Sequence, residues 1–308
     1  MYYPILFLAY FFLANACINP MLGLGQEVKN VLEAFESLSI EPEVLLVSNN
    51  LEVPMQTGHL QGVQVIEQKG KYKLLISGSS LTESYLLQVD LVTLKTERLI
   101  PLMKSPFRHA GGFQVSSPYL AVGIEDNFIK TTSKICLYNY RQEDLYNAQA
   151  NLVIDRKGEA KLYTAGTTGI LDLESSYLSL VSNWDSRNWD FYSIVPEKSE
   201  QKFLHRFNAP DNWGSYQSIN LIMDEEAIYA IGTYQKELVG IADLILVSKR
   251  GPFEPIMKLI KTKTFNCKKG VDFSTAAGIQ VDKEGDLHIW GTQRDASEKI
   301  AINRFSQE

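Results

Sequence analysis

The sequence predicts an all-β fold built from one unit that recurs along the chain. From about residue 43 onward, short apolar and β-branched runs alternate with clusters of Gly, Ser, Asn and Asp, which is typical of strands joined by turns. Within this region a short motif returns at nearly regular intervals. Residues 26–38 instead have apolar positions at spacings of three and four, which predicts one short helix before the strands.

The recurring motif is clearest in its first two copies. Residues 59–65 read HLQGVQV and residues 109–115 read HAGGFQV, so His, Gly, Gln and Val all return after 50 positions. Residues 275–281 keep the Gly-apolar-Gln-Val part, and residues 166–170 and 215–221 are looser copies. The fourth positions of the five copies are Gly62, Gly112, Gly169, Ser218 and Gly278.

Each of the first four copies opens a unit with four predicted strands. In the first unit these strands are residues 62–66, 72–77, 85–90 and 97–100. Four short antiparallel strands in about 50 residues are typical of one blade of a β-propeller.

The fifth unit contains three predicted strands, and its fourth has a candidate upstream of the first unit. Residues 44–48 read VLLVS, and pairing with residues 299–303 would join the two ends of the domain. A ring closed in this way leaves no exposed sheet edge. The sequence therefore predicts four complete units and one shared unit.

Residues 43–308 resemble the β-propeller superfold, of the five-bladed type. The region 72–100, with the turn DLVTLK at 90–95, looks like a generic propeller blade. The resemblance identifies no subfamily, because the chain carries no Trp-Asp repeat signature, no kelch double glycine and no convincing glycosidase motif. The alternative is a pair of β-sandwiches, which would not predict one motif recurring five times.

The N-terminal residues predict export. Residues 2–17 read YYPILFLAYFFLANAC, an apolar run of signal-peptide length that ends in small residues suited to cleavage. We expect a signal peptide at 1–16, a linker with the short helix at 17–42 and the propeller at 43–308. The protein is then extracytoplasmic, either secreted or a cell-envelope lipoprotein held to the membrane through a lipid on Cys17. A cytosolic protein with an apolar N-terminus is the remaining alternative.

Charge and cysteine content restrict the partners. The net charge of -6 argues against nucleic acid, which requires a basic surface. Besides Cys17, the chain has Cys136 and Cys267, which we expect to be free thiols, with a disulfide between them as the alternative. No cofactor is predicted, although a divalent cation is compatible with the sequence.

Propeller topology places certain loops on one face. The loops that lead into the first strands share a rim with the loops between second and third strands, so their polar residues should converge there. These candidate ligand-binding residues are His59, Arg108, His109, Glu125, Asp126, Trp184, Asp185, Arg187, Asp190, Trp213, Arg294 and Asp295.

Two features of this set suggest chemistry. His59 and His109 occupy equivalent places in neighbouring units, where two imidazoles could bind a metal, act as acid and base, or simply cap their strands. Residues 183–190, NWDSRNWD, combine indoles with carboxylates and suit a sugar, or form an Asp- and Asn-rich turn.

No local catalytic motif is present in the sequence. We therefore expect a non-enzymatic module that binds a small molecule, glycan or protein through this face. The alternative is a hydrolase of glycans or phosphoesters that uses carboxylates at the channel mouth.

Overall fold

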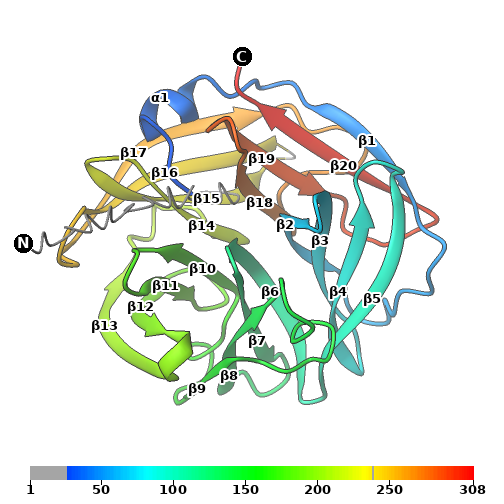
Figure 1. The fold of residues 1–308 in the computed structure, drawn as a ribbon, viewed down its shortest axis with the longest axis horizontal. Coiled ribbons are helices and arrows are strands. Elements are labelled where there is room, and N and C mark those ends of the chain that lie inside the picture. The colour runs from blue at the N-terminus through cyan, green and yellow to red at the C-terminus, as the bar shows by residue number, and fades with distance from the viewer. Residues whose placement is uncertain (1–25, 238) are drawn as a thin grey trace, which may run out of the picture.

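Twenty strands, one α-helix and one 3-10 helix, η1 (Pro196–Lys198), make up the computed structural model, which describes residues 26–237 and 239–308. The strands form five antiparallel sheets arranged around a central axis, so the chain is a five-bladed β-propeller (Figure 1).

Each of the first four blades is made of four strands that are consecutive in the chain. Blade 1 contains β2 (Leu60–Gln68), β3 (Lys71–Ser79), β4 (Glu83–Asp90) and β5 (Lys95–Lys104). Blade 2 contains β6 (Phe107–Ser116), β7 (Tyr119–Asp126), β8 (Thr132–Asn139) and β9 (Leu152–Lys157). Blade 3 contains β10 (Thr167–Asp172), β11 (Tyr177–Ser182), β12 (Asn188–Val195) and β13 (Glu200–Asn208). Blade 4 contains β14 (Ser218–Met223), β15 (Ala227–Lys236), β16 (Val239–Lys249) and β17 (Pro255–Phe265).

Blade 5 is shared between the two ends of the domain. It contains β18 (Ala276–Val281), β19 (Leu287–Thr292) and β20 (Lys299–Ser306), with β1 (Glu43–Ser48) as its outer strand. β1 pairs antiparallel with β20 from Glu43 opposite Arg304 to Ser48 opposite Lys299. Figure 1 shows the blue β1 beside the red β20. The predicted closure is confirmed.

The first strands of neighbouring blades approach one another closely around the axis. Ala277 of β18 bridges Gly62 of β2, and Gly112 of β6 bridges Thr167 of β10. A Cβ on Gly278 would lie 1.8 Å from the Val63 carbonyl oxygen. The repeated glycine of the motif is thus explained by a crowded channel with no room for a side chain at this position.

Hydrophobic cores lie between the blades. The buried apolar residues form five clusters, and each cluster joins two neighbouring blades around the ring. The cluster between blades 5 and 1 includes Val47 of β1, whose side chain is fully buried. Since burying such a side chain contributes roughly 1.5–3 kcal/mol, the closing strand is held by packing as well as by its hydrogen bonds.

The helix is shorter than predicted. The predicted span was 26–38, whereas α1 covers Val31–Glu36. It begins where the Asn30 side chain accepts a hydrogen bond from the Glu33 N–H, a common N-terminal cap. Before the helix, Glu27 bridges Met223 of β14, and this backbone pairing with a strand competes with helical turns.

The remaining predictions about the chain's ends and cysteines have different outcomes. The signal peptide and Cys17 lie outside the described residues. Within residues 26–237 and 239–308, no helix is both long and apolar enough to cross a membrane. Cys136 is buried and Cys267 half-buried, and both are free thiols, so the disulfide alternative is wrong.

Candidate functional site

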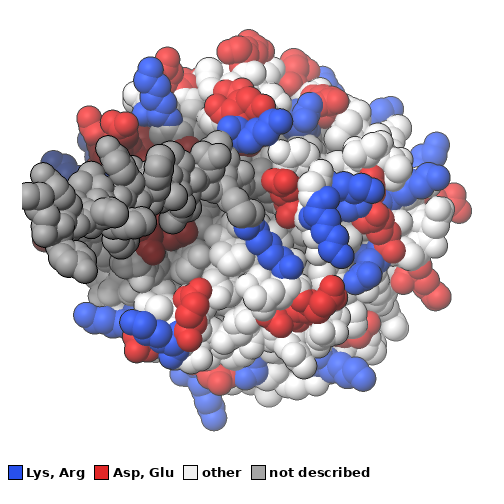
Figure 2. Space-filling view, in the orientation of Figure 1, with Lys and Arg blue, Asp and Glu red and all other residues white. Residues whose placement is uncertain are grey.

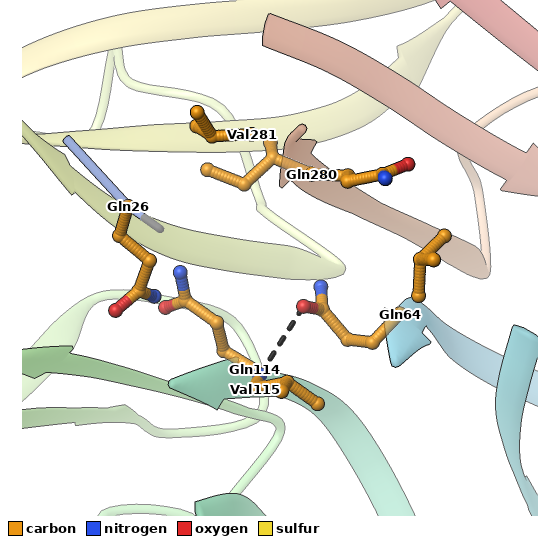
Figure 3. A pocket seen from close by; sticks show the side chains of 8 residues that line it. Gln26, Gln64, Gln114, Val115, Gln280 and Val281 are labelled. Atoms are coloured by element: carbon orange, nitrogen blue, oxygen red, sulfur yellow. Dashed lines mark hydrogen bonds between the residues drawn. The ribbon is translucent and has the colours of Figure 1, made fainter. Parts of the chain in front are cut away.

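The central channel is filled by amide side chains that join neighbouring blades. Gln114 accepts hydrogen bonds from the backbone N–H groups of Ile170 and Leu221, and it donates to the Leu221 carbonyl. Gln64 accepts from the Val115 N–H, as the dashed line in Figure 3 shows. These amides satisfy buried backbone groups, so the recurring Gln of the motif has a structural role.

The mouth of the channel on the side of the β2–β3 turn is narrow. We call this side the turn face. A cavity of about 20 Å³ remains there, enough for about one water molecule, and Gln26, Gln64, Gln114 and Gln280 surround it (Figure 3). Gln26, from the segment before α1, donates to the Ile170 carbonyl across this mouth. A substrate of sugar size does not fit at this end.

The opposite mouth, on what we call the histidine face, holds a buried cluster of titratable groups. The rings of His59 and His109 are edge to face with centroids 5.9 Å apart, as the repeat predicted for equivalent positions of two blades. The Gln61 amide nitrogen lies 2.9 Å from His109 Nε2 and 3.1 Å from His59 Nε2. Glu125, at the end of β7, lies behind His109, with its Oε1 3.4 Å from His109 Nδ1.

One amide group contacts both imidazoles. The Gln61 amide nitrogen lies 3.0 Å from His59 Nδ1 as well as 3.1 Å from His59 Nε2, and His59 Nδ1 also lies 3.0 Å from the Leu60 carbonyl oxygen. Nδ1 of His109 points to Glu125. A neutral imidazole has one donor and one acceptor nitrogen, so the amide oxygen and nitrogen of Gln61 can serve either tautomer of each ring.

Burial shifts the pKa values of all three groups. It lowers the pKa of His59, and it lowers the pKa of His109 to about 3, with the neighbouring His59, Arg108 and Lys130 acting in the same direction. It raises the pKa of Glu125 to about 7, although a hydrogen bond from the Ala165 N–H opposes the shift. Glu125 is therefore a carboxyl group that gains and loses a proton near neutral pH.

Beside this cluster the histidine face is hollowed between blades 1 and 2. The hollow has a volume of about 270 Å³ and is bordered by Arg108, Asp126, Phe128, Ile129 and Leu81. Phe128 is 84% exposed and Ile129 64% exposed, which is unusual for side chains of this size. An open site with exposed apolar side chains, one cation and one carboxylate is suited to a polar ligand with an apolar face.

Trp184 extends this surface toward blade 3. Its ring is half exposed, and the Lys130 ammonium lies 4.5 Å above the ring centroid. Asp185, the next residue, caps the turn by accepting from the Arg187 N–H. The predicted sugar-binding stretch therefore contributes one exposed indole to the histidine face.

Several other predicted site residues are held in structural contacts. Arg187 donates to three backbone carbonyls of the loop before blade 4, at Pro210, Trp213 and Gly214. The Trp213 ring packs on the buried Trp189 at a centroid distance of 5.9 Å.

Asp190 is also removed from the rim. It is almost fully buried and accepts hydrogen bonds from Arg156 and Arg206 at 2.7 and 2.6 Å. Burial alone would raise the pKa of Asp190, but these two guanidinium groups outweigh burial and lower it. The blade 5 residues, Arg294 and Asp295, are exposed, and their charges act on His59.

Sequence reasoning missed three residues of this face. Gln61 lies inside the motif, between His59 and the recurring glycine, yet it does not recur, since residue 111 is a glycine. Phe128 and Ile129 gave no periodic signal because they sit in a turn that Asp126 caps through their two N–H groups. An apolar pair in a predicted loop was the available clue.

No group of metal ligands marks this face. Among residues 26–237 and 239–308, no three His, Cys, Asp or Glu side chains are grouped as metal ligands. On the face of the molecule that Figure 2 draws, positive and negative side chains are interspersed. The distinctive chemistry of the histidine face is therefore the buried Glu125–His109 pair.

Comparison with known proteins establishes the fold. No protein-family model and no curated protein matches the sequence. The structure resembles the catalytic domain of a GH62 α-L-arabinofuranosidase from Coprinopsis cinerea, with a TM-score of 0.50 and 7% identity over 85% of this chain and 97% of that one. It also resembles an exo-β-1,3-galactanase from Phanerochaete chrysosporium, with a TM-score of 0.51 and 6% identity over 86% of this chain and 64% of that one. A member of the DUF4221 family from Bacteroides vulgatus is 12% identical over 87% of this chain and 97% of that one, with a TM-score of 0.41.

One prediction is corrected at this point. The chain was expected to be a non-enzymatic binding module, whereas the structures that share its fold include enzymes that cleave glycosidic bonds. The absence of a local catalytic motif was a poor guide, because propeller enzymes assemble their sites from loops of several blades.

Proposed function

We propose that the protein hydrolyses a glycan on the histidine face, with the Glu125–His109 pair as its general acid. The observation that carries the proposal is Glu125, a fully buried carboxyl group with its pKa raised to about 7 and in contact with a neutral imidazole. Glycosidic cleavage needs a carboxyl group that is protonated near neutral pH.

The pair supplies a path for the proton to the surface. Glu125 has no exposed area, whereas His109 in front of it retains 6% of its surface. Glu125 is thus the group that stores the proton, and His109 is the group that meets the glycosidic oxygen. In the tautomer that carries its proton on Nε2, His109 gives this proton to the glycosidic oxygen while Nδ1 takes the proton of Glu125, so the imidazole stays neutral and Glu125 becomes a carboxylate. General acid catalysis by such a positioned group contributes roughly 10²- to 10⁴-fold in rate.

The neighbouring hollow provides the binding surface. Phe128 and Trp184 offer exposed aromatic faces for the apolar side of a sugar ring. Asp126 and Arg108 border the hollow and supply partners for hydroxyl groups. Asp126 is the second carboxylate that we assign to the site: it borders the hollow, its Oδ1 caps the turn through the Phe128 and Ile129 N–H groups, and its proposed role is to activate water.

Support from the fold is by analogy. The arabinofuranosidase and the galactanase act on glycans with the same architecture, although a shared fold does not itself transfer an activity. Export through the predicted signal peptide would place the enzyme where polysaccharides occur.

The test is hydrolysis of aryl arabinofuranosides, galactosides and xylosides and of β-1,3-galactan. We expect turnover by the wild-type protein, with a rate that falls above about pH 7 as Glu125 loses its proton. Glu125→Gln should lower kcat by at least about 100-fold, in line with loss of a general acid. The matched control is Glu159→Gln, an exposed carboxylate on the β9 side of the same blade, which should keep full activity.

Two results would contradict the proposal. One is equal turnover in Glu125→Gln and Glu159→Gln. The other is the absence of turnover on every substrate of the panel, combined with a folded wild-type protein.

A further inference from the structure

A second hollow lies on the turn face of blade 1, away from the proposed active site. It has a volume of about 340 Å³, and its lining includes Lys69, Lys71, Lys73 and Arg98. Four cations around one hollow are notable in a chain whose net charge is -6.

The β2–β3 turn sets the position of the first two lysines. Gln68 pairs with Lys71, so Lys69 and Gly70 alone form the turn, and both have positive φ, +52° and +73°. This is the two-residue turn that matches the twist of a hairpin. It places Lys69 at the tip and Lys71 at the start of β3, and both side chains are exposed.

Lys73 has a structural role within the hollow. Its ammonium is buried and bonds both Asp90 and Glu97. The Gln88 amide donates a second hydrogen bond to Glu97 at 2.9 Å. The one carboxylate that lines the hollow is therefore already neutralised by a lysine and occupied by donors.

The other three cations have no carboxylate partner. Within the described residues, Lys69, Lys71 and Arg98 form no salt bridge, whereas other lysines and arginines of this part of the chain form ten, two of them made by Lys73 in this hollow. The Arg98 guanidinium lies 4.6 Å above the Tyr146 ring, a contact that orients it without satisfying its donors. Tyr146 is itself held in place, since its hydroxyl oxygen lies 2.9 Å from the amide oxygens of both Gln68 and Gln88 and donates its one proton to one of them.

We propose that this hollow binds oxyanion groups, namely the carboxylates or sulfates of an acidic polysaccharide. A planar guanidinium and two ammonium groups around an open depression match charges repeated along a chain. The nine residues of β3 separate the turn from the histidine face, about 30 Å at the usual rise per residue. The hollow is thus separate from the histidine face, and it does not depend on the chemistry of Glu125.

Binding is tested by calorimetric titration of the full-length protein with three probes. These are oligogalacturonide, a sulfated oligosaccharide and inorganic phosphate, each at low and moderate salt. We expect the saccharides to bind to the wild-type protein, and the double variant Lys71→Gln/Arg98→Gln to bind at least tenfold more weakly. The control is Lys202→Gln/Lys249→Gln, which removes the same charge at two exposed lysines without ion pairs among the described residues and should change the affinity by less than twofold.

The outcomes distinguish specific binding in this hollow from attraction to the charge of the whole protein. Equal weakening in both double variants would show attraction to net charge alone and would overturn the proposal, as would failure of all three probes to bind. Phosphate binding as tight as saccharide binding, lost in Lys71→Gln/Arg98→Gln, would overturn the assignment to a polysaccharide and leave a site for a free anion. Saccharide binding that survives Glu125→Gln but not Lys71→Gln/Arg98→Gln would support this site whether or not the protein is a hydrolase.

Discussion

The two mouths of the channel use polar side chains in opposite ways. On the turn face, Gln64 and Gln114 bond to backbone groups of neighbouring blades. On the histidine face, His109 Nδ1 and Glu125 Oε1 are buried 3.4 Å apart, and neither atom has a hydrogen-bond partner among the described residues. Neutral amides keep their hydrogen bonds at every pH, whereas an imidazole facing a carboxyl group changes with the proton it holds.

The difference separates the scaffold from the candidate site. A buried polar group that is fully satisfied stabilises the ring, while a pair left partly unsatisfied lowers stability and is typical of functional sites. If this interpretation is correct, substitutions at the turn mouth should change stability, and substitutions at the histidine mouth should change chemistry.

The largest effect is expected for Gln114→Leu. The variant keeps the side-chain volume but leaves the N–H groups of Ile170 and Leu221 buried without their acceptor. Each unsatisfied group costs about 1–3 kcal/mol, so the free energy of unfolding should fall by roughly 2–5 kcal/mol. Urea denaturation followed by tryptophan fluorescence measures it.

Gln280→Leu is the matched control at the same mouth. Gln280 is partly exposed, and it accepts from the Trp290 indole N–H at 2.9 Å rather than from two backbone groups. The free energy of unfolding of Gln280→Leu should fall by about 1 kcal/mol. Similar losses in the two variants would mean that the inter-blade amide bonds do not hold the ring.

The next prediction concerns Glu125→Gln, which should change stability less than Gln114→Leu and should increase it. Folding raises the pKa of Glu125 from 4.5 to about 7, so the folded protein binds this proton more tightly than the unfolded chain. The resulting stability is complete below pH 4.5 and is lost as the pH rises through 7. The glutamine of Glu125→Gln is neutral at every pH. The free energy of unfolding of this variant should therefore exceed that of the wild-type protein by up to roughly 3 kcal/mol at pH 8 and by little at pH 4.

Chemical denaturation at both pH values distinguishes this prediction from a structural carboxylate. Glu159→Gln, which lies on the surface, should show no such pH-dependent difference. Destabilisation by Glu125→Gln at pH 8 would show that the folded protein needs the ionised carboxylate. It would contradict the interpretation that the turn mouth is structural and the histidine mouth functional.

The fold could be predicted in detail because its determinants are local and repeated. The motif gave the five first strands, and the apolar run at 44–48 gave the closing strand that pairs with β20. Helix α1 was less predictable, because its start depends on the bridge of Glu27 with a strand nearly 200 residues away.

The site was predicted less well than the fold. The repeat brought His59 and His109 together correctly, since equivalent blade positions meet at one mouth. Loop topology also put Glu125 and Asp190 on the rim, but it could not show that one is buried behind His109 and the other between two arginines. Burial depends on how neighbouring blades pack, and no local pattern carries that information.

The smallest effect on stability is expected for Trp184→Ala, which tests whether the exposed surface of the histidine face binds sugar. The ring is half exposed, and its main described contact is Lys130, a cation–π pair worth about 0.5–1 kcal/mol. Stability should therefore change by less than about 1 kcal/mol. Affinity for an oligosaccharide should fall about tenfold, because a stacked indole contributes roughly 1–2 kcal/mol to such contacts. Phe203→Ala is the matched control, since Phe203 is 52% exposed on the outer strand β13. Equal affinity in the two variants, measured by titration with the best substrate of the panel, would move the binding surface away from Trp184.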